Sequence, residues 1–138
     1  MEITKFYDYN SLSFKKINEL KKLTISEYSG MNVVLKELEN YKIIKNKVKA
    51  KIICHYVNSK IVSWALLTRE KTSFFNEKTW NPKKGYWIQI YTQKDFRSKG
   101  IAGKIIKRCN KYIKSKVYYA SMQIPGAFKN LKKGISIY

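Results

Sequence analysis

Two segments near the start of the chain repeat their apolar residues every three or four positions, which is the spacing of one helix face. The first segment follows Ser11 and Ser13, either of which can cap a helix N-terminus, and the second follows Gly30. These spacings predict two amphipathic helices and a helical first third of the chain. The apolar positions are Phe14, Ile17, Leu20 and Leu23 in the first helix and Met31, Val34, Leu35, Leu38 and Tyr41 in the second.

From Val48 onward the pattern changes to β-branched and aromatic residues, which are typical of strands. Residues 48–57 and 61–68 form two such runs, joined by the short polar turn 58–60, and this arrangement predicts a β-hairpin. The polar segment 72–84 contains a proline and is predicted to be a loop. Its aromatic residues either line a pocket or pin the loop to the core; they are Phe74, Phe75 and Trp80.

A strand, a glycine-containing turn and a helix then follow in direct succession. Residues 85–93 (GYWIQIYTQ) are predicted to be a strand, and a helix of about 15 residues, roughly 22 Å long, is expected from Gly100. A further strand is predicted over 116–124, and the intervening helix implies that the two strands are parallel. A short helix around 127–133 and a final ISIY segment complete an α/β pattern that we assign to a single domain spanning residues 1–138.

Length and composition narrow the class of protein. The chain has 138 residues, which suits one domain, and 44% hydrophobic residues, which suffice for a core. The longest apolar run, residues 61–67, is too short to cross a bilayer, and the start has no signal-peptide pattern, so we expect a cytoplasmic protein without membrane association. Cys54 and Cys109 lack the spacing of a metal site or a disulfide framework, and we expect two buried thiols and no metal.

The chain is strongly basic, with 29 Lys and Arg against 9 Asp and Glu and a formal net charge of +20. Such a surplus attracts phosphate-rich partners such as nucleic acid. A bias toward AT-rich codons would raise the lysine content equally well without any partner. No acidic residue follows Asp95, however, and the helix beginning near Gly100 has one basic face, formed by Lys104, Lys107, Arg108, Lys111 and Lys114.

The turn before this helix has the features of a phosphate site. The first turn of a helix presents backbone N–H groups without internal partners at the positive end of the helix dipole. Gly100 removes a side chain where a ligand would approach, and the small Ala102 and Gly103 keep that approach open. Mobile positive charge is expected nearby from Arg97, Lys99 and Lys104.

The segment Arg97-Ser98-Lys99-Gly100-Ile101-Ala102 resembles the Q/R-x-x-G-x-G/A acetyl-CoA turn of the GNAT (GCN5-related) N-acetyltransferases. The hairpin containing VNSKIVSWALL and the order of the elements agree with that family. The resemblance implies a mixed, mostly antiparallel sheet flanked by helices, with a shortened C-terminal end. It also implies direct transfer of an acetyl group from acetyl-CoA to an amine in a ternary complex. The coenzyme-binding residues that it implies are Tyr91, Thr92, Arg97, Ser98, Lys99, Gly100, Ile101, Ala102, Gly103 and Lys104, with Tyr91 and Thr92 acting through their backbones.

The sequence departs from the family at both usual proton-handling positions. Gln89 stands where a glutamate base is common, and Asn130 stands where a tyrosine acid is common. A water chain or other side chains would have to replace them. The catalytic candidates are His55, Tyr118 and Tyr119, with Glu70 and Glu77 as further bases, and a packing role is the alternative for the histidine and the tyrosines.

The acceptor is left open between a small amine, a protein amine and an amino group on nucleic acid or aminoacylated tRNA. The last third of the chain carries basic residues and no acidic ones, which favours a polyanionic acceptor. A short C-terminal end implies either an open site for a bulky substrate or completion by a second subunit in a homodimer. Two alternatives without catalysis are a basic nucleic-acid-binding module on the same fold and a regulatory protein that binds a partner through its basic face.

Overall fold

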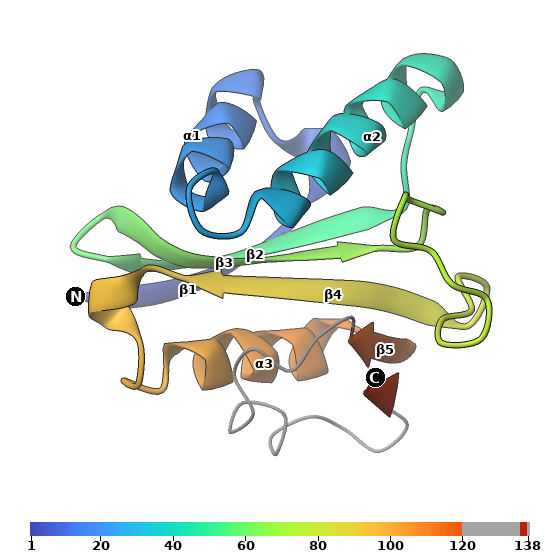
Figure 1. Cartoon of the computed structure of the whole chain (residues 1–138). Coiled ribbons are helices and arrows are strands. Elements are labelled where there is room, and N and C mark those ends of the chain that lie inside the picture. The colour runs from blue at the N-terminus through green and yellow to red at the C-terminus, as the bar shows by residue number, and fades with distance from the viewer. Residues whose placement is uncertain (120–135, 138) are drawn as a thin grey trace.

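The computed structural model describes residues 1–119 together with 136 and 137. Their order along the chain is strand, two helices, three strands, a third helix and two short strands (Figure 1). The strands are β1 (Glu2–Asp8), β2 (Ala50–Val57), β3 (Lys60–Thr68), β4 (Gly85–Thr92), β5 (Lys116–Tyr119) and β6 (Ser136–Ile137). The helices are α1 (Phe14–Thr24), α2 (Ser29–Lys45) and α3 (Ile101–Tyr112), with the short 3-10 turns η1 (Tyr9–Ser11) and η2 (Lys94–Phe96).

All six strands form one sheet in the order β1-β2-β3-β4-β5-β6. Strands β1 to β4 pair with one another in antiparallel fashion, whereas β5 runs parallel to β4 and β6 parallel to β5. Helices α1 and α2 cover one face of the sheet and α3 covers the other (Figure 1). Each face therefore has its own apolar core, and the predicted mixed, mostly antiparallel sheet flanked by helices is confirmed.

Local signals in the sequence identified most of these elements correctly. The Ser13 side chain caps α1 by accepting from the Lys16 backbone N–H at 3.1 Å. The β2–β3 hairpin turns at Asn58 and Ser59, which both have positive φ values of 48° and 70°. The parallel arrangement of β4 and β5 is confirmed by a register that pairs Gly85 with Lys116. Both cysteines are buried thiols, as expected.

Three expectations about the elements are wrong. The first third of the chain is not entirely helical, because residues 2–8 form β1, which pairs along its full length with β2. Phe14 is 73% exposed, because α1 begins at this residue and turns it away from the core. Helix α3 has 12 residues instead of about 15, since the backbone becomes extended at Ile113 (φ −99°, ψ 117°). The predicted strand beyond Tyr119 and the helix around 127–133 lie outside the described residues.

The loop between β3 and β4 is attached to the core by its aromatic residues. Trp80 is buried, stacks on Trp87 of β4 at 5.8 Å between ring centroids, and donates its indole N–H to the Gly85 carbonyl at 3.0 Å. Phe75 packs edge-on against Trp80, and Phe74 stacks on Trp87. Of the two interpretations of these aromatics, the structure supports the one in which they pin the loop.

Candidate functional site

The turn that joins β4 to α3 is open at its apex. Ser98 and Gly100 both have positive φ values, 62° and 77°, and Gly100 is the N-cap residue of α3. A left-handed backbone favours glycine, because a Cβ atom there is strained. A Cβ built at Gly100 would meet no atom within 4 Å among the described residues, so nothing described fills the space in front of the helix.

The first turn of α3 presents backbone N–H groups to this space. The first intrahelical bond is donated by Lys104 N–H to the Gly100 carbonyl at 3.2 Å, which leaves the earlier amides without a helical partner. No side chain caps this end of the helix, and its first turn contains no acidic residue. The buried side chains of Ile101 and Ala102 anchor the turn against the sheet. Bare amides at a helix N-terminus suit an anion such as a diphosphate.

The charged side chains around this turn are less free than the sequence predicts. Arg97 is held in place, since its Nη2 lies 2.8 Å from Glu27 Oε2 and its Nε donates to the Thr92 carbonyl at 2.8 Å. The expectation of mobile charge at Arg97 is therefore wrong. Lys104 forms an exposed ion pair with Glu2 at 3.0 Å, and Lys99 lies over the Phe96 ring. The two lysines are the side chains best able to turn toward a bound anion.

The last residues of β4 direct part of their backbone toward the β5 side of the sheet. Gln93 N–H donates to the Val62 carbonyl of β3 at 2.9 Å, and bonding alternates along an antiparallel pair. Tyr91 therefore faces β3 with its N–H and C=O, while Ile90 and Thr92 face the other side. The described part of β5 pairs with β4 only as far as Ile88, so Ile90 and Thr92 lie beyond that pairing.

This alternation separates the two residues whose backbones were predicted to bind the coenzyme arm. The Tyr91 carbonyl points to β3 and accepts from Ser63 Oγ at 2.7 Å. Thr92 has the outward orientation that the prediction requires, although its carbonyl accepts from Arg97. Ile90, whose backbone the family resemblance also implies for this arm, has the same outward orientation as Thr92.

Glu27 is a residue of this site that the sequence did not reveal. It lies in the connection between α1 and α2, and its carboxylate accepts from the Tyr91 hydroxyl at 2.8 Å and pairs with Arg97. The hydrogen bonds from Tyr91 and then Arg97 lower the pKa of Glu27. Burial, followed by the bond to Glu27, raises the pKa of Tyr91. Because Glu27 and Arg97 are 70 positions apart, no local pattern could have paired them.

His55 lies on the α3 side of the sheet, and both of its ring nitrogens have hydrogen-bond partners. It is 1% exposed, with Nδ1 2.7 Å from Thr4 Oγ1 and Nε2 2.9 Å from Glu2 Oε1. The bond from His55, and then the bond from Lys104, lower the pKa of Glu2, which is therefore an ionised acceptor. This geometry favours the packing role of His55, in which it joins β1 to β2.

The tyrosine candidates differ in what the structure describes. Tyr118 is buried in the core beneath α1 and α2 and pairs in register with Trp87, which favours packing for this residue. Tyr119 pairs with Ile88 in the sheet. Asn130 lies outside the described residues.

Gln89 is buried on the face covered by α1 and α2, and it is 4% exposed. Its Oε1 atom has no hydrogen-bond partner in the part of the chain that the structure describes. The nearby Trp64 of β3, which pairs with Tyr91, likewise has an unpartnered indole Nε1 there. Gln89 therefore brings an unsatisfied acceptor, and not a base, to the position that the resemblance assigns to the catalytic glutamate.

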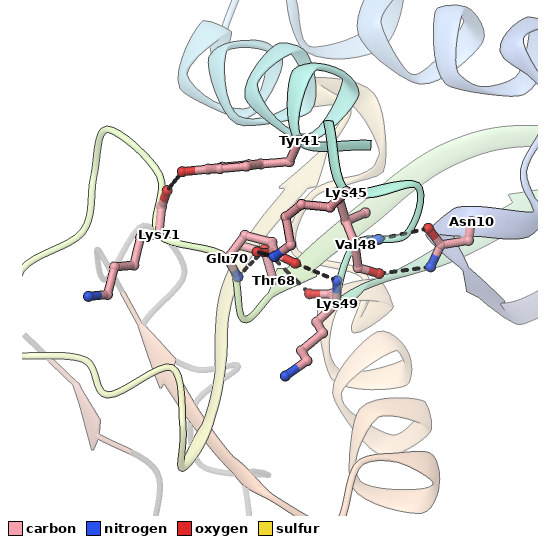
Figure 2. A network of polar contacts seen from close by, with 8 residues as sticks. All are labelled: Asn10, Tyr41, Lys45, Val48, Lys49, Thr68, Glu70 and Lys71. Atoms are coloured by element: carbon pink, nitrogen blue, oxygen red, sulfur yellow. Dashed lines mark hydrogen bonds and ion pairs between the residues drawn. The ribbon is translucent and has the colours of Figure 1, made fainter. Parts of the chain in front are cut away.

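Glu70 is engaged in a structural network where β3 ends (Figure 2). Its carboxylate accepts from the Lys49 backbone N–H at 2.8 Å and from Lys45 Nζ at 2.7 Å. In the same network, Asn10 bonds both the N–H and the C=O of Val48, at 3.0 and 2.7 Å. This network joins the end of β3 to the α2–β2 connection, so Glu70 is held away from the α3 turn. Glu77 is exposed in the β3–β4 loop.

Comparison with known proteins shows the fold. No family model and no curated sequence matches the chain. The solved structures that resemble it include the aminoglycoside acetyltransferase meta-AAC0020 from an uncultured soil metagenomic sample, with a TM-score of 0.60, 14% identity, and coverage of 91% of this chain and 80% of that chain. A predicted acetyltransferase with acetyl-CoA from Clostridium acetobutylicum has a TM-score of 0.57 and 14% identity, with coverage of 94% and 87%.

A third similar structure is the ribosomal-protein-alanine N-acetyltransferase from Brucella melitensis biovar Abortus 2308, with a TM-score of 0.53, 16% identity, and coverage of 94% and 86%. The chain thus has the fold of the GNAT acetyltransferases, as the sequence resemblance predicts. Within the described residues, no helix has the length and apolar character needed to cross a membrane.

Proposed function

We propose that the chain is an N-acetyltransferase that uses acetyl-CoA as its co-substrate. The observation that carries this proposal is the open N-terminal turn of α3, with a left-handed Gly100, first amides that have no helical partner, and no acidic residue in the first helical turn. The GNAT fold supports it, because solved structures of that fold include one described as a predicted acetyltransferase with acetyl-CoA. An anion site alone does not define a reaction, so the proposed reaction class rests on analogy with acetyltransferases of this fold.

In this proposal the amides from Ser98 to Gly103 bind the diphosphate of the coenzyme, and Lys99 and Lys104 balance its charge. Lys104 leaves an exposed pair with Glu2 to do so, which costs little, because solvent screens an exposed ion pair. The outward backbone groups of Ile90 and Thr92 would bond the pantetheine arm. Arg97 acts indirectly, by fixing the turn to Glu27 and to the end of β4.

The transfer step is direct attack of a neutral amine on the thioester carbonyl. The amine nitrogen forms a bond to the acyl carbon, the C–S bond breaks and the coenzyme leaves as a thiolate. The one proton that the amine nitrogen loses passes to this thiolate or to water. An alkyl amine has a pKa of roughly 10.4, so it must lose its ammonium proton before it attacks. Gln89 cannot take that proton, and we assign it instead to bonding the acceptor amine or a water through its free Oε1.

Tyr118, Tyr119 and His55 stay candidates for proton transfer on sequence grounds. The bonds that His55 makes to Thr4 and Glu2 argue for a structural role instead. The catalytic contribution of the chain then comes chiefly from positioning and from N–H groups that stabilise the developing oxyanion. This interpretation implies a slow enzyme at neutral pH that becomes faster as the pH rises and more of the acceptor amine is neutral.

We further propose a polyanionic or bulky acceptor. The outer face of α3 carries Lys107 and Lys111, both exposed, and Arg108, and no acidic residue follows Asp95 anywhere in the chain. This field would concentrate a polyanion near the coenzyme turn. Binding through this surface should weaken steeply with added salt.

The test is mass spectrometry of candidate acceptors incubated with isotope-labelled acetyl-CoA. The wild type should add one acetyl group, and Gly100→Glu should abolish the mass shift. Gly100→Gln is the matched control, since it places a side chain of similar size in the same left-handed position without the negative charge. If Gly100→Glu loses the mass shift and Gly100→Gln keeps it, an anion binds in front of α3. An acceptor acetylated equally well by Gly100→Glu would contradict the site.

A further inference from the structure

A cavity lies on the opposite face of the sheet from the α3 turn. It has a volume of about 610 Å³ and is lined by residues of β1, α1, the end of β2 and the hairpin turn. Tyr7 of β1 and Tyr56 of β2 form part of its wall and pack against the core beneath α1 and α2. The sheet lies between α1 and α3 (Figure 1), and this cavity is lined in part by Lys16 of α1, so a ligand here would be independent of the proposed coenzyme.

A lysine ammonium and two tyrosine hydroxyls form a hydrogen-bonded chain in this cavity, and one phenol proton of the chain has no acceptor. The hydroxyl groups of Tyr7 and Tyr56 lie 2.7 Å apart, and Lys16 Nζ lies 3.3 Å from the Tyr56 hydroxyl, to which it donates. Each phenol has one proton, and only one of the two protons can lie between the two oxygens. The other phenol O–H therefore has no acceptor among the described residues. A ligand oxygen would satisfy it.

Positive charge surrounds the same two phenols. Lys5 Nζ and Lys16 Nζ each lie 5.4 Å from the centre of the Tyr56 ring. All nine acidic side chains of the protein lie in the part that the structure describes, and none of them forms an ion pair with Lys5. Lys16 is 3.5 Å from Glu19, but that carboxylate is about half exposed and lies on the neighbouring helical turn. Two ammonium groups and a free phenol donor thus face a cavity whose lining contains no acidic residue.

The phenols keep their protons at neutral pH. Burial, and then the bond to Tyr56, raise the pKa of Tyr7 to about 12. Burial also raises the pKa of Tyr56. Both hydroxyls are therefore available as donors under ordinary conditions, and neither adds negative charge that would compete with a ligand.

We infer that this cavity binds a small molecule that carries a phosphate group on an apolar or planar body. Two ammonium groups and a phenol O–H match the charge and the acceptor oxygens of a phosphate dianion better than those of a single carboxylate. The Ile3 side chain and the two tyrosine rings supply an apolar wall beside them. The volume suits a ligand larger than inorganic phosphate, since small-molecule pockets measure roughly 300–1,000 Å³.

The test is an NMR titration of the full ¹⁵N-labelled chain with phenyl phosphate, with inorganic phosphate as the comparison. Amide shifts of Lys5 and Tyr56 report on this cavity, and those of Ile101 and Ala102 report separately on the α3 turn. Phenyl phosphate should give saturable shifts at Lys5 and Tyr56 and bind more tightly than inorganic phosphate. Saturating acetyl-CoA should not displace it, so failure here and failure of the proposed function are distinguishable.

Single substitutions assign the binding to the cavity. Lys5→Gln and Lys16→Gln should each weaken phenyl phosphate by about tenfold, because each removes a charged hydrogen-bond donor. Tyr7→Phe leaves one free phenol O–H, that of Tyr56, and should therefore weaken binding less than either lysine substitution. Lys15→Gln is the matched control, since it removes the same charge from an exposed neighbouring position of α1.

Two results would overturn the inference. One is the absence of saturable shifts at Lys5 and Tyr56 up to about 10 mM phenyl phosphate, which is weaker than a functional site would be. The other is an equal loss of affinity in Lys15→Gln and Lys16→Gln, which would show that the general positive charge of the protein is responsible.

Discussion

Gly85 begins β4 at the point where β5 approaches it most closely, and replacing it with alanine should separate the two strands. A Cβ atom at Gly85 would lie 1.9 Å from the Lys116 carbonyl oxygen and 2.6 Å from the carbonyl carbon. Ordinary contact needs 3.4 Å or more, so the strands would have to move apart by about 1.5 Å. The atoms in the way are backbone, which cannot rotate aside as a side chain would.

The cost follows from the bonds between the strands. β4 and β5 are paired over four residues each, and a shift of this size would disrupt two or three backbone hydrogen bonds. At roughly 0.5–1.5 kcal/mol net for each bond, we expect Gly85→Ala to lower the free energy of unfolding by about 1–4.5 kcal/mol. Urea unfolding followed by circular dichroism measures this value.

Gly30→Ala is the control for this experiment. A Cβ at Gly30 would meet its nearest atom, Phe74 Cζ, at an ordinary 3.5 Å, and Gly30 lies in the first turn of α2. The same substitution there should leave stability unchanged or raise it by up to about 1 kcal/mol. If Gly85→Ala unfolds within about 0.5 kcal/mol of the wild type, which is within the range of an ordinary surface substitution, the close approach of β4 and β5 is refuted.

Three further predictions concern other parts of the fold. The pKa of Glu27 is lowered by its bonds from Tyr91 and Arg97, so its stabilising contribution is present above its unfolded value of 4.5 and is lost as the pH falls through the folded value. Glu27→Gln should therefore be less stable than the wild type at pH 7 in urea unfolding, and the difference should shrink as the pH falls through the folded pKa; a difference that does not change with pH would contradict the carboxylate's role. Burial raises the pKa of Cys54 to about 12, so a thiol reagent at about pH 8 should label it only after the protein is unfolded in urea; rapid labelling of the native protein would disprove its burial. Asn10→Ala removes both bonds to the α2–β2 connection and should lower the free energy of unfolding by about 1–3 kcal/mol, whereas an unchanged urea midpoint would mean that the network in Figure 2 adds no stability.

The parts of the fold that local patterns specify were predictable from the sequence. The hairpin follows from two apolar runs around a short polar turn, and the β4–turn–α3 unit follows from a strand pattern that gives way to helical spacing at Gly100. Helical crossover rules then gave the parallel direction of β5. Each of these features depends on residues that are neighbours in the chain.

β1 was missed because it is an edge strand with a weak pattern. Its sequence EITKFYD places Lys5 between two apolar residues of the α1 side, and its faces are only partly covered, so the strict alternation of a half-buried strand is lost. Its position is determined by pairing with β2, about 50 residues away. Such long-range pairing leaves no mark on a seven-residue window.

The part of the site formed by local backbone could be predicted from the sequence. The contacts between side chains that lie far apart in the chain could not. The open turn at Gly100 follows from a glycine that precedes a helix. The fixing of Arg97 by Glu27 and the bonding of His55 to Thr4 and Glu2 require the sheet to be assembled first. The open turn could therefore be predicted from the sequence, whereas Arg97 was assigned too much freedom, and the choice between packing and catalysis for His55 was left open.

The central claim is that the backbone amides in the first turn of α3 bind the diphosphate of acetyl-CoA. Calorimetric titration of acetyl-CoA into the wild type, Gly100→Gln and Gly100→Glu tests this most directly. Both variants carry the same backbone strain of about 1–2 kcal/mol at a positive φ, so their difference isolates the charge. We predict saturable binding to the wild type and at least about tenfold weaker binding to Gly100→Glu than to Gly100→Gln. A wild-type protein that does not bind acetyl-CoA, or two variants with equal affinity, would contradict the claim.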